Sequence, residues 1–229
     1  MSTKSIEMST QKQLVVTAML IALCVVLPMA FHSIPRAGSI ILPMHIPVLL
    51  AGLICGWKFG LLTGVAGVLL STALTGMPPA GIAPIMIIEL GTYGFVAGLV
   101  MKFVRTKRAS FDLYASLIAS MLVGRVVAGI AQVVYFFGGS FFGGRYIARG
   151  PEYGEYVQSY VYNDYGYAEL VTQWVPEMVY HSIYPLAMWV TSYFVTSLPG
   201  LVIQFAFVPA VVMALERERL IPFRYPVQA

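Results

Sequence analysis

Two charged residues, Glu89 and Arg125, lie inside strongly apolar segments and are the first candidates for chemistry. A charge at the centre of a bilayer costs at least ~2.5–3.5 kcal/mol, so each side chain is expected to face the protein interior or a cavity. One interpretation is a mutual ion pair that holds two helices together; the other is that one or both charges line a solute site. Tyr93 follows Glu89 at i+4, and Gln132 follows Arg125 at i+7, so each charge begins a polar stripe on its helix. Such a stripe favours a cavity open to the exterior, and the two interpretations are compatible.

The segment 138–197 holds the second concentration of chemistry. Nine of the fourteen tyrosines lie between Tyr146 and Tyr184, together with five acids. One interpretation is that the rings stack on a flat solute while the acids accept its hydrogen bonds. The alternative is an interfacial aromatic belt with a solvated loop. The candidate contacts in this segment are Trp174, Glu177, Tyr180 and His181.

The histidines and the missing motifs limit the chemistry. His32, His45 and His181 lack the spacing of a zinc set, so no metal is expected, and His45 is kept as a candidate contact to the solute. The sequence has no GxxxxGK[ST] phosphate loop, HExxH element or GxSxG element. An enzyme would depend on Glu89 and His181 alone. We therefore predict a protein that is not an enzyme and carries no cofactor.

The composition indicates an integral membrane protein. Hydrophobic residues make up 59% of the 229 residues and charged residues 10%, and the mean hydropathy is +0.79. Soluble domains are nearer about 25% charged. The length suits a single membrane domain over residues 1–229. Cys24 and Cys55 lie in apolar segments without metal or redox spacing, which predicts core packing.

Apolar helices must position the candidate residues. The expected fold class is an all-α integral membrane protein, a six-transmembrane-helix bundle with a long aromatic outer segment, 138–197, between helices 5 and 6. The first span is expected to be retained, because Pro28-Met29-Ala30 is a poor signal-peptide cleavage site. The second and third spans form a hairpin that turns at Gly56–Gly60, and glycines at four-residue spacing allow close packing there. The predicted spans are approximately 14–31, 44–56, 60–76, 83–104, 113–137 and 198–215.

The basic residues predict the orientation. Six spans put both termini on one side, where ten basic residues lie, against three on the other side. The N- and C-termini are therefore expected to be cytoplasmic, and the formal charge of +4 reflects topology rather than nucleic-acid binding. A seventh span within Val171–Val190 would move the C-terminus outside, so this stretch is predicted to be an interfacial or re-entrant helix that covers the outer face.

Several segments resemble one family of transporters. Residues 42–64 read LPMHIPVLLAGLICGWKFGLLTG, residues 74–79 read LTGMPP, residues 121–125 read MLVGR and residues 198–204 read LPGLVIQ. These segments resemble the substrate-binding subunits (S components) of energy-coupling-factor (ECF) vitamin transporters. The resemblance covers most of the chain except residues 138–190, and this departure leaves the substrate open.

The resemblance implies a function and partners. Such a subunit binds one vitamin-like micronutrient outside a bacterial cell and delivers it through a transmembrane coupling subunit and two cytoplasmic ATPases. It also implies that Ala18 and Ala22, an Ala-xxx-Ala pair on the first span, contact the coupling subunit. The protein would lie in the bacterial plasma membrane. The alternative is a stand-alone secondary carrier or channel for a small solute.

The expected pocket is formed by the loops His32–Pro43 and Gly76–Ala83, the outer halves of the fourth and fifth spans, and the aromatic segment. Arg125 would meet a carboxylate or another acceptor, and Trp174 or Tyr180 would stack. Aromatic enrichment favours a heterocycle, such as a pterin, flavin or deazapurine base, over a flexible acid such as pantothenate.

Overall fold

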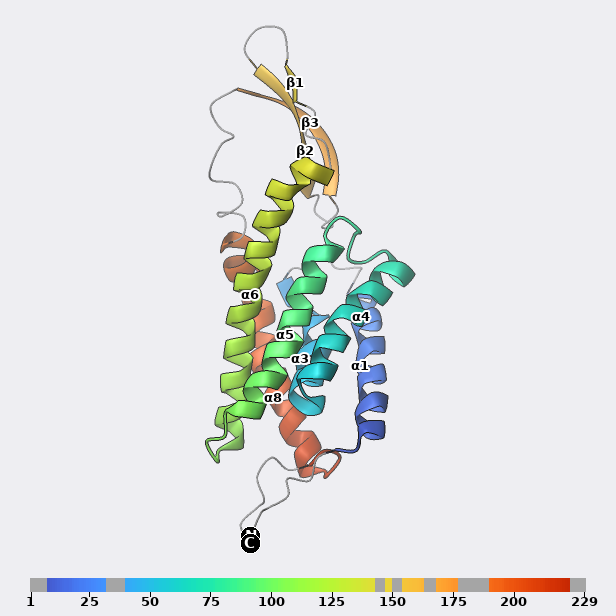
Figure 1. Cartoon of the computed structure of the whole chain (residues 1–229), viewed down its shortest axis with the longest axis vertical. Coiled ribbons are helices and arrows are strands. Elements are labelled where there is room, and N and C mark those ends of the chain that lie inside the picture. The colour runs from blue at the N-terminus through green and yellow to red at the C-terminus, as the bar shows by residue number, and fades with distance from the viewer. Residues whose placement is uncertain are drawn as a thin grey trace.

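Helix α5 (Ala83–Phe103) is the centre of the bundle, where it packs against α3 (His45–Cys55), α4 (Trp57–Thr75) and α6 (Ala109–Phe142). Two further helices lie around this group: α1 (Thr10–Ala30) packs against α3 and α4, and α8 (Leu198–Arg217) packs against α3 and α6. Figure 1 shows this arrangement. The structure is a computed structural model that describes residues 8–31, 40–142, 147–149, 154–162, 168–176 and 190–222.

Five of the described helices are long and apolar enough to cross a membrane: α1, α4, α5, residues 109–132 of α6, and α8. Their bounds agree with five of the predicted spans to within about four residues at most ends, although α6 continues to Phe142. The remaining predicted span, 44–56, corresponds to α3, which has only 11 residues. A helix of that length measures roughly 16 Å, about half of a bilayer's hydrocarbon core. The count of six spans therefore depends on how α3 is counted.

The hairpin of α3 and α4 is present, and its turn is tighter than predicted. Only Gly56 separates the two helices, with a φ of 92° that glycine adopts without a steric penalty. The expectation of a turn over Gly56–Gly60 is wrong beyond its first residue, because the chain from Trp57 onward is already helical. A Cβ atom at Gly56 would meet no neighbour within 4 Å, so the positive φ is the reason that this turn favours glycine.

Glycines bring α3, α4 and α5 together backbone to backbone. A Cβ atom added at Gly60 would lie 2.6 Å from the carbonyl carbon of Gly94 and 2.7 Å from the Cα atom of Gly52. Ordinary contacts of a Cβ atom begin near 3.4 Å. The four-residue spacing of Gly52 with Gly56 and of Gly60 with Gly64 predicted close packing, and the structure confirms it at Gly52, Gly60 and Gly64. The structure adds Gly94 of α5 to these glycines.

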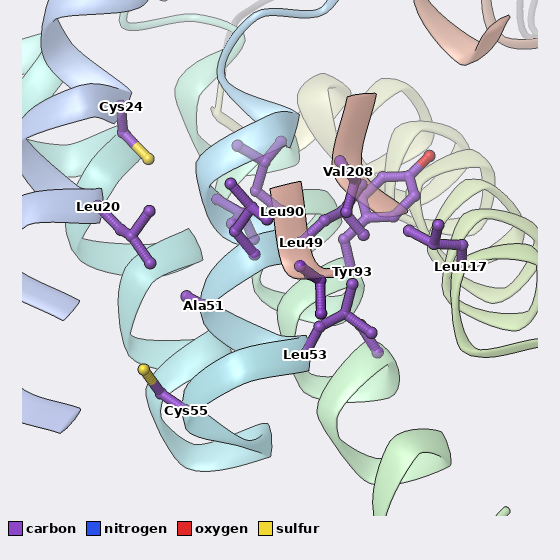
Figure 2. Packing of buried hydrophobic residues seen from close by; sticks show 14 of the residues in the cluster. Leu20, Cys24, Leu49, Ala51, Leu53, Cys55, Leu90, Tyr93, Leu117 and Val208 are labelled. Carbon is purple, nitrogen blue, oxygen red and sulfur yellow. The ribbon is translucent and has the colours of Figure 1, made fainter. Parts of the chain in front are cut away.

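The buried apolar side chains form one core around α3. Nine of the 11 residues of α3 are buried, which explains how so short a helix is accommodated: its neighbours cover it on every side. Figure 2 shows Leu49 of α3 with Leu90, Tyr93, Leu117 and Val208, which come from the surrounding helices and belong to the same cluster. Cys24 and Cys55 are buried free thiols, in agreement with the predicted core role.

A three-stranded antiparallel sheet follows α6, in the order β1 (Ile147–Arg149), β2 (Gly154–Tyr162) and β3 (Ala168–Pro176). Its register pairs Tyr156 with Trp174 and Tyr160 with Leu170. The membrane bundle is helical as predicted, but the interfacial helix expected over Val171–Val190 is wrong for residues 171–176, which are in β3. Residues 177–189 lie outside the described residues. Strands β2 and β3 contain four Val and three Tyr, together with one Trp and one Thr, and all of these residue types favour extended backbone.

Candidate functional site

Glu89 lies in the second turn of α5, and its carboxylate is contacted from two other elements. The Oε1 atom of Glu89 is 3.4 Å from Nε2 of His45, the first residue of α3. The hydroxyl of Tyr193 donates to Oε2 of Glu89 at 3.2 Å. Tyr193 belongs to η1 (Thr191–Thr196), a short π-helix just before α8. The carboxylate thereby joins α3, α5 and η1.

Arg125 of α6 is held by a parallel set of contacts. Its Nε atom donates to the hydroxyl of Tyr93 at 3.2 Å, and its Nη2 atom donates to Oγ of Ser197 at 2.9 Å. The Ser197 hydroxyl in turn donates to the backbone carbonyl of Tyr193 at 2.6 Å. The guanidinium carbon lies 5.5 Å from the centre of the Phe194 ring, within the range of a cation–π contact. Arg125 thus connects α6 to α5 and to the residues that precede α8.

The two charges share one buried polar cluster without touching. The exposed fractions are 6% for Glu89 and 3% for Arg125, and the Tyr93 side chain near both is 1% exposed. Among the described residues, Glu89 is bonded to His45 and Tyr193 rather than to Arg125, so the direct ion pair considered from the sequence does not form. The cluster carries one negative and one positive charge, which lowers the cost of burying each of them.

Tyr93 also orients the imidazole ring of His45. The rings of His45 and Tyr93 meet edge to face, with their centroids 5.1 Å apart and their planes at 70°. This contact and the bond to Glu89 leave the imidazole little freedom to turn. Its second nitrogen, Nδ1, is buried and has no hydrogen-bond partner. The arrangement is suited to binding a polar solute. Among the described residues, no group of three His, Cys, Asp or Glu side chains could hold a metal ion.

Comparison with known protein families shows what kind of protein contains this cluster. Residues 12–212 match the family described as "ECF transporter, substrate-specific component", which covers most of the 229 residues. The chain belongs to this family. No curated protein and no solved structure matched the chain. Family membership together with the five long apolar helices makes the chain a multi-pass membrane protein and the substrate-specific part of a transporter.

The structure brings together four of the residues predicted as solute contacts in this ECF substrate-specific component: His45, Glu89, Tyr93 and Arg125. Gln132 lies two turns further along α6, half-buried, with its Oε1 atom unpartnered. Trp174 is in β3, and its side chain is not described. The other predicted contacts, Glu177, Tyr180 and His181, lie outside the described residues.

Three residues of the cluster were not predicted from the sequence: Tyr193, Phe194 and Ser197. They were counted with the outer segment, although Ser197-Leu198-Pro199 is a typical start of a helix. Two aromatic residues just before such a start are in a position to reach the helices that pack beside it. That signal could have assigned Tyr193 and Phe194 to the bundle.

An open groove in the described surface of this substrate-specific component lies elsewhere. It has a volume of about 440 Å³, and it runs between α5 and α6. Its lining is apolar: Pro84, Ile85, Ile88, Val127, Ile130, Ala131 and Val134. A groove with this lining, on helices that cross the membrane, suits contact with lipid and offers no polar group to a solute. We therefore take the buried polar cluster, and not this groove, as the candidate site.

Proposed function

We propose that this protein captures a vitamin or related micronutrient outside the cell and passes it to a transmembrane coupling subunit driven by two cytoplasmic ATPases. The observation that carries the proposal is the buried cluster of Glu89, Arg125, His45 and Tyr93 inside a chain of the ECF substrate-specific family. Charged groups at this depth are costly and mark solute pathways in membrane proteins. Contributions from α3, α5, α6 and η1 allow the cluster to surround a small molecule.

The position of the cluster supports binding from the side that bears the sheet. His45 begins α3 and Ser197 directly precedes α8, so the cluster lies toward the end of the bundle where these helices start. Figure 1 shows the sheet beyond that same end. Of the ten described Lys and Arg residues, Arg125 is in the cluster and Arg149 is in β1. The other eight lie at or near the opposite ends of the helices: Lys12, Lys58, Lys102, Arg105, Lys107, Arg108, Arg217 and Arg219. By the positive-inside rule this opposite end is cytoplasmic, so the solute arrives from outside.

Helix α1 provides the surface for the coupling subunit in this proposal. Ala18 and Ala22 are both exposed on α1, and small residues four apart allow another helix to approach closely. An Ala18→Arg variant should lose the coupling subunit on co-purification. The matched control is Met19→Arg, at the same depth on the exposed surface but about 100° around the helix. If both variants retain the partner, or both lose it, the assignment of this surface is wrong.

A thermal-shift screen of the detergent-purified protein against vitamins and nucleobase precursors tests the solute-binding function. A ligand at 1,000 times its dissociation constant stabilises the folded state by ~4 kcal/mol, which is readily detected. One strong stabiliser would support the proposal and name the substrate class. Transport of a solute in vesicles without ATP or partner subunits would instead favour a stand-alone carrier.

A further inference from the structure

An unpartnered nitrogen in the buried cluster points to the chemistry of the solute. His45 is 3% exposed, and its Nε2 atom faces the Glu89 carboxylate, which can only accept a hydrogen bond. In the neutral tautomer that donates from Nε2 to this carboxylate, Nδ1 presents a lone pair. That lone pair is buried and without a partner. A buried polar atom of this kind calls for a donor from a water or a ligand.

The Glu89 carboxylate also has lone pairs that no described donor contacts. An ionised carboxylate offers about four lone-pair sites. For Glu89, the described residues supply two donors, the Nε2 atom of His45 and the hydroxyl of Tyr193. On this side of the cluster, acceptors outnumber the donors that face them.

We propose that the solute presents an edge of N–H donors to His45 and Glu89, as an amino-substituted nitrogen heterocycle does. This inference rests on the proposed solute-binding function and narrows its substrate class. The two acceptors come from different helices and are held in place, His45 by its edge contact with Tyr93 and Glu89 by Tyr193. A rigid edge with an exocyclic amino group beside a ring N–H can donate to both at once. A flexible carboxylic acid presents no such edge.

Pairs of heterocycles that exchange the amino group of this edge for an oxo group provide the test. Pterin and lumazine form one such pair, and guanine and xanthine form another. Dissociation constants are measured on the full-length purified protein. Since a hydrogen bond to a charged group is the stronger kind, the amino member of the pair that fits should bind about 10- to 100-fold more tightly.

Two variants test whether Glu89 and His45 cause the preference for the amino member of a pair. In Glu89→Gln and in His45→Phe, the preference for the amino member should fall to threefold or less, from the 10- to 100-fold expected for the unmodified chain. Ser116→Ala is the control, because Ser116 is buried on the same helix as Arg125 but bonds to Asp112 and Met101 instead of the cluster. It should retain the full preference. The two Glu89 and His45 variants report independently if one of them fails to fold.

Three results would overturn the inference. The first is equal binding of amino and oxo members, and the second is a preference that survives both cluster variants. The third is binding to none of the heterocycles by a folded protein. The proposed function is judged separately by co-purification with the coupling subunit. A protein that keeps its partner and binds a different vitamin would therefore retain its function and lose only this substrate class.

Discussion

Replacing Gly60 with alanine should destabilise the bundle, although alanine is the better helix former by about 1 kcal/mol. The added methyl group would lie 2.6 Å from the Gly94 carbonyl carbon and 2.7 Å from the Gly52 Cα atom, where ordinary contact begins near 3.4 Å. Both obstacles are backbone atoms, so neither can move aside by a side-chain rotation. Overpacking of this kind costs about 1–3 kcal/mol. With the obstacle on two helices at once, we expect the upper end and a net loss of about 2 kcal/mol.

The assay is thermal unfolding of the purified protein in detergent, followed by intrinsic fluorescence. A loss of about 2 kcal/mol corresponds to a decrease in Tm of roughly 4–8 °C for a chain of this size. Gly81→Ala is the matched control, since Gly81 is exposed and a Cβ atom there would meet nothing within 4 Å. Its Tm should stay close to that of the unmodified protein. A Gly60→Ala protein as stable as this control would refute the backbone-to-backbone packing of α3, α4 and α5.

Three further predictions concern single polar contacts. Arg125→Met should weaken solute binding by about 10- to 100-fold in an equilibrium binding assay; unchanged affinity with a lower Tm would make Arg125 purely structural. Ser197→Ala removes the 2.9 Å bond to Arg125 and should lower the free energy of unfolding by about 1–3 kcal/mol in thermal unfolding, whereas no loss would discount that bond. Asp112→Ala removes the bonds that its Oδ1 accepts from the backbone N–H of Thr106 at 3.0 Å and from the Thr106 hydroxyl at 2.6 Å. A similar loss is expected, with the exposed Ser110→Ala unaffected; equal Tm values for the two variants would contradict it.

The helices were predictable because long apolar segments have few alternatives in a membrane. The predicted bounds of α4 and α5 lie within about three residues of the structure, and burial of Glu89 and Arg125 followed from the cost of exposing a charge to lipid. The contacts of these charges did not follow. Which residue reaches Glu89 depends on how far each helix is rotated about its axis, and packing over the whole bundle decides that rotation.

The sheet and η1 were missed for different reasons. Hydropathy describes burial in lipid, and it carries little information where the chain leaves the membrane, so the strand preference of β2 and β3 was overlooked. The contribution of Tyr193 to the site was missed because its partner, Glu89, is 104 residues away in the sequence. A single sequence contains no local signal for such a contact.

The enclosure of α3 has a consequence for how the protein is synthesised. Most of its surface is covered by α1, α4, α5 and α8, and three of these helices are made after it. An 11-residue helix that begins with a histidine is too short to span the membrane, so it should not insert into lipid on its own during synthesis. We expect α3 to insert into the membrane together with α4, as a hairpin, and to become fully covered only after α5 and α8 have inserted. The solute site would then be assembled only when α8 and the residues just before it are in place.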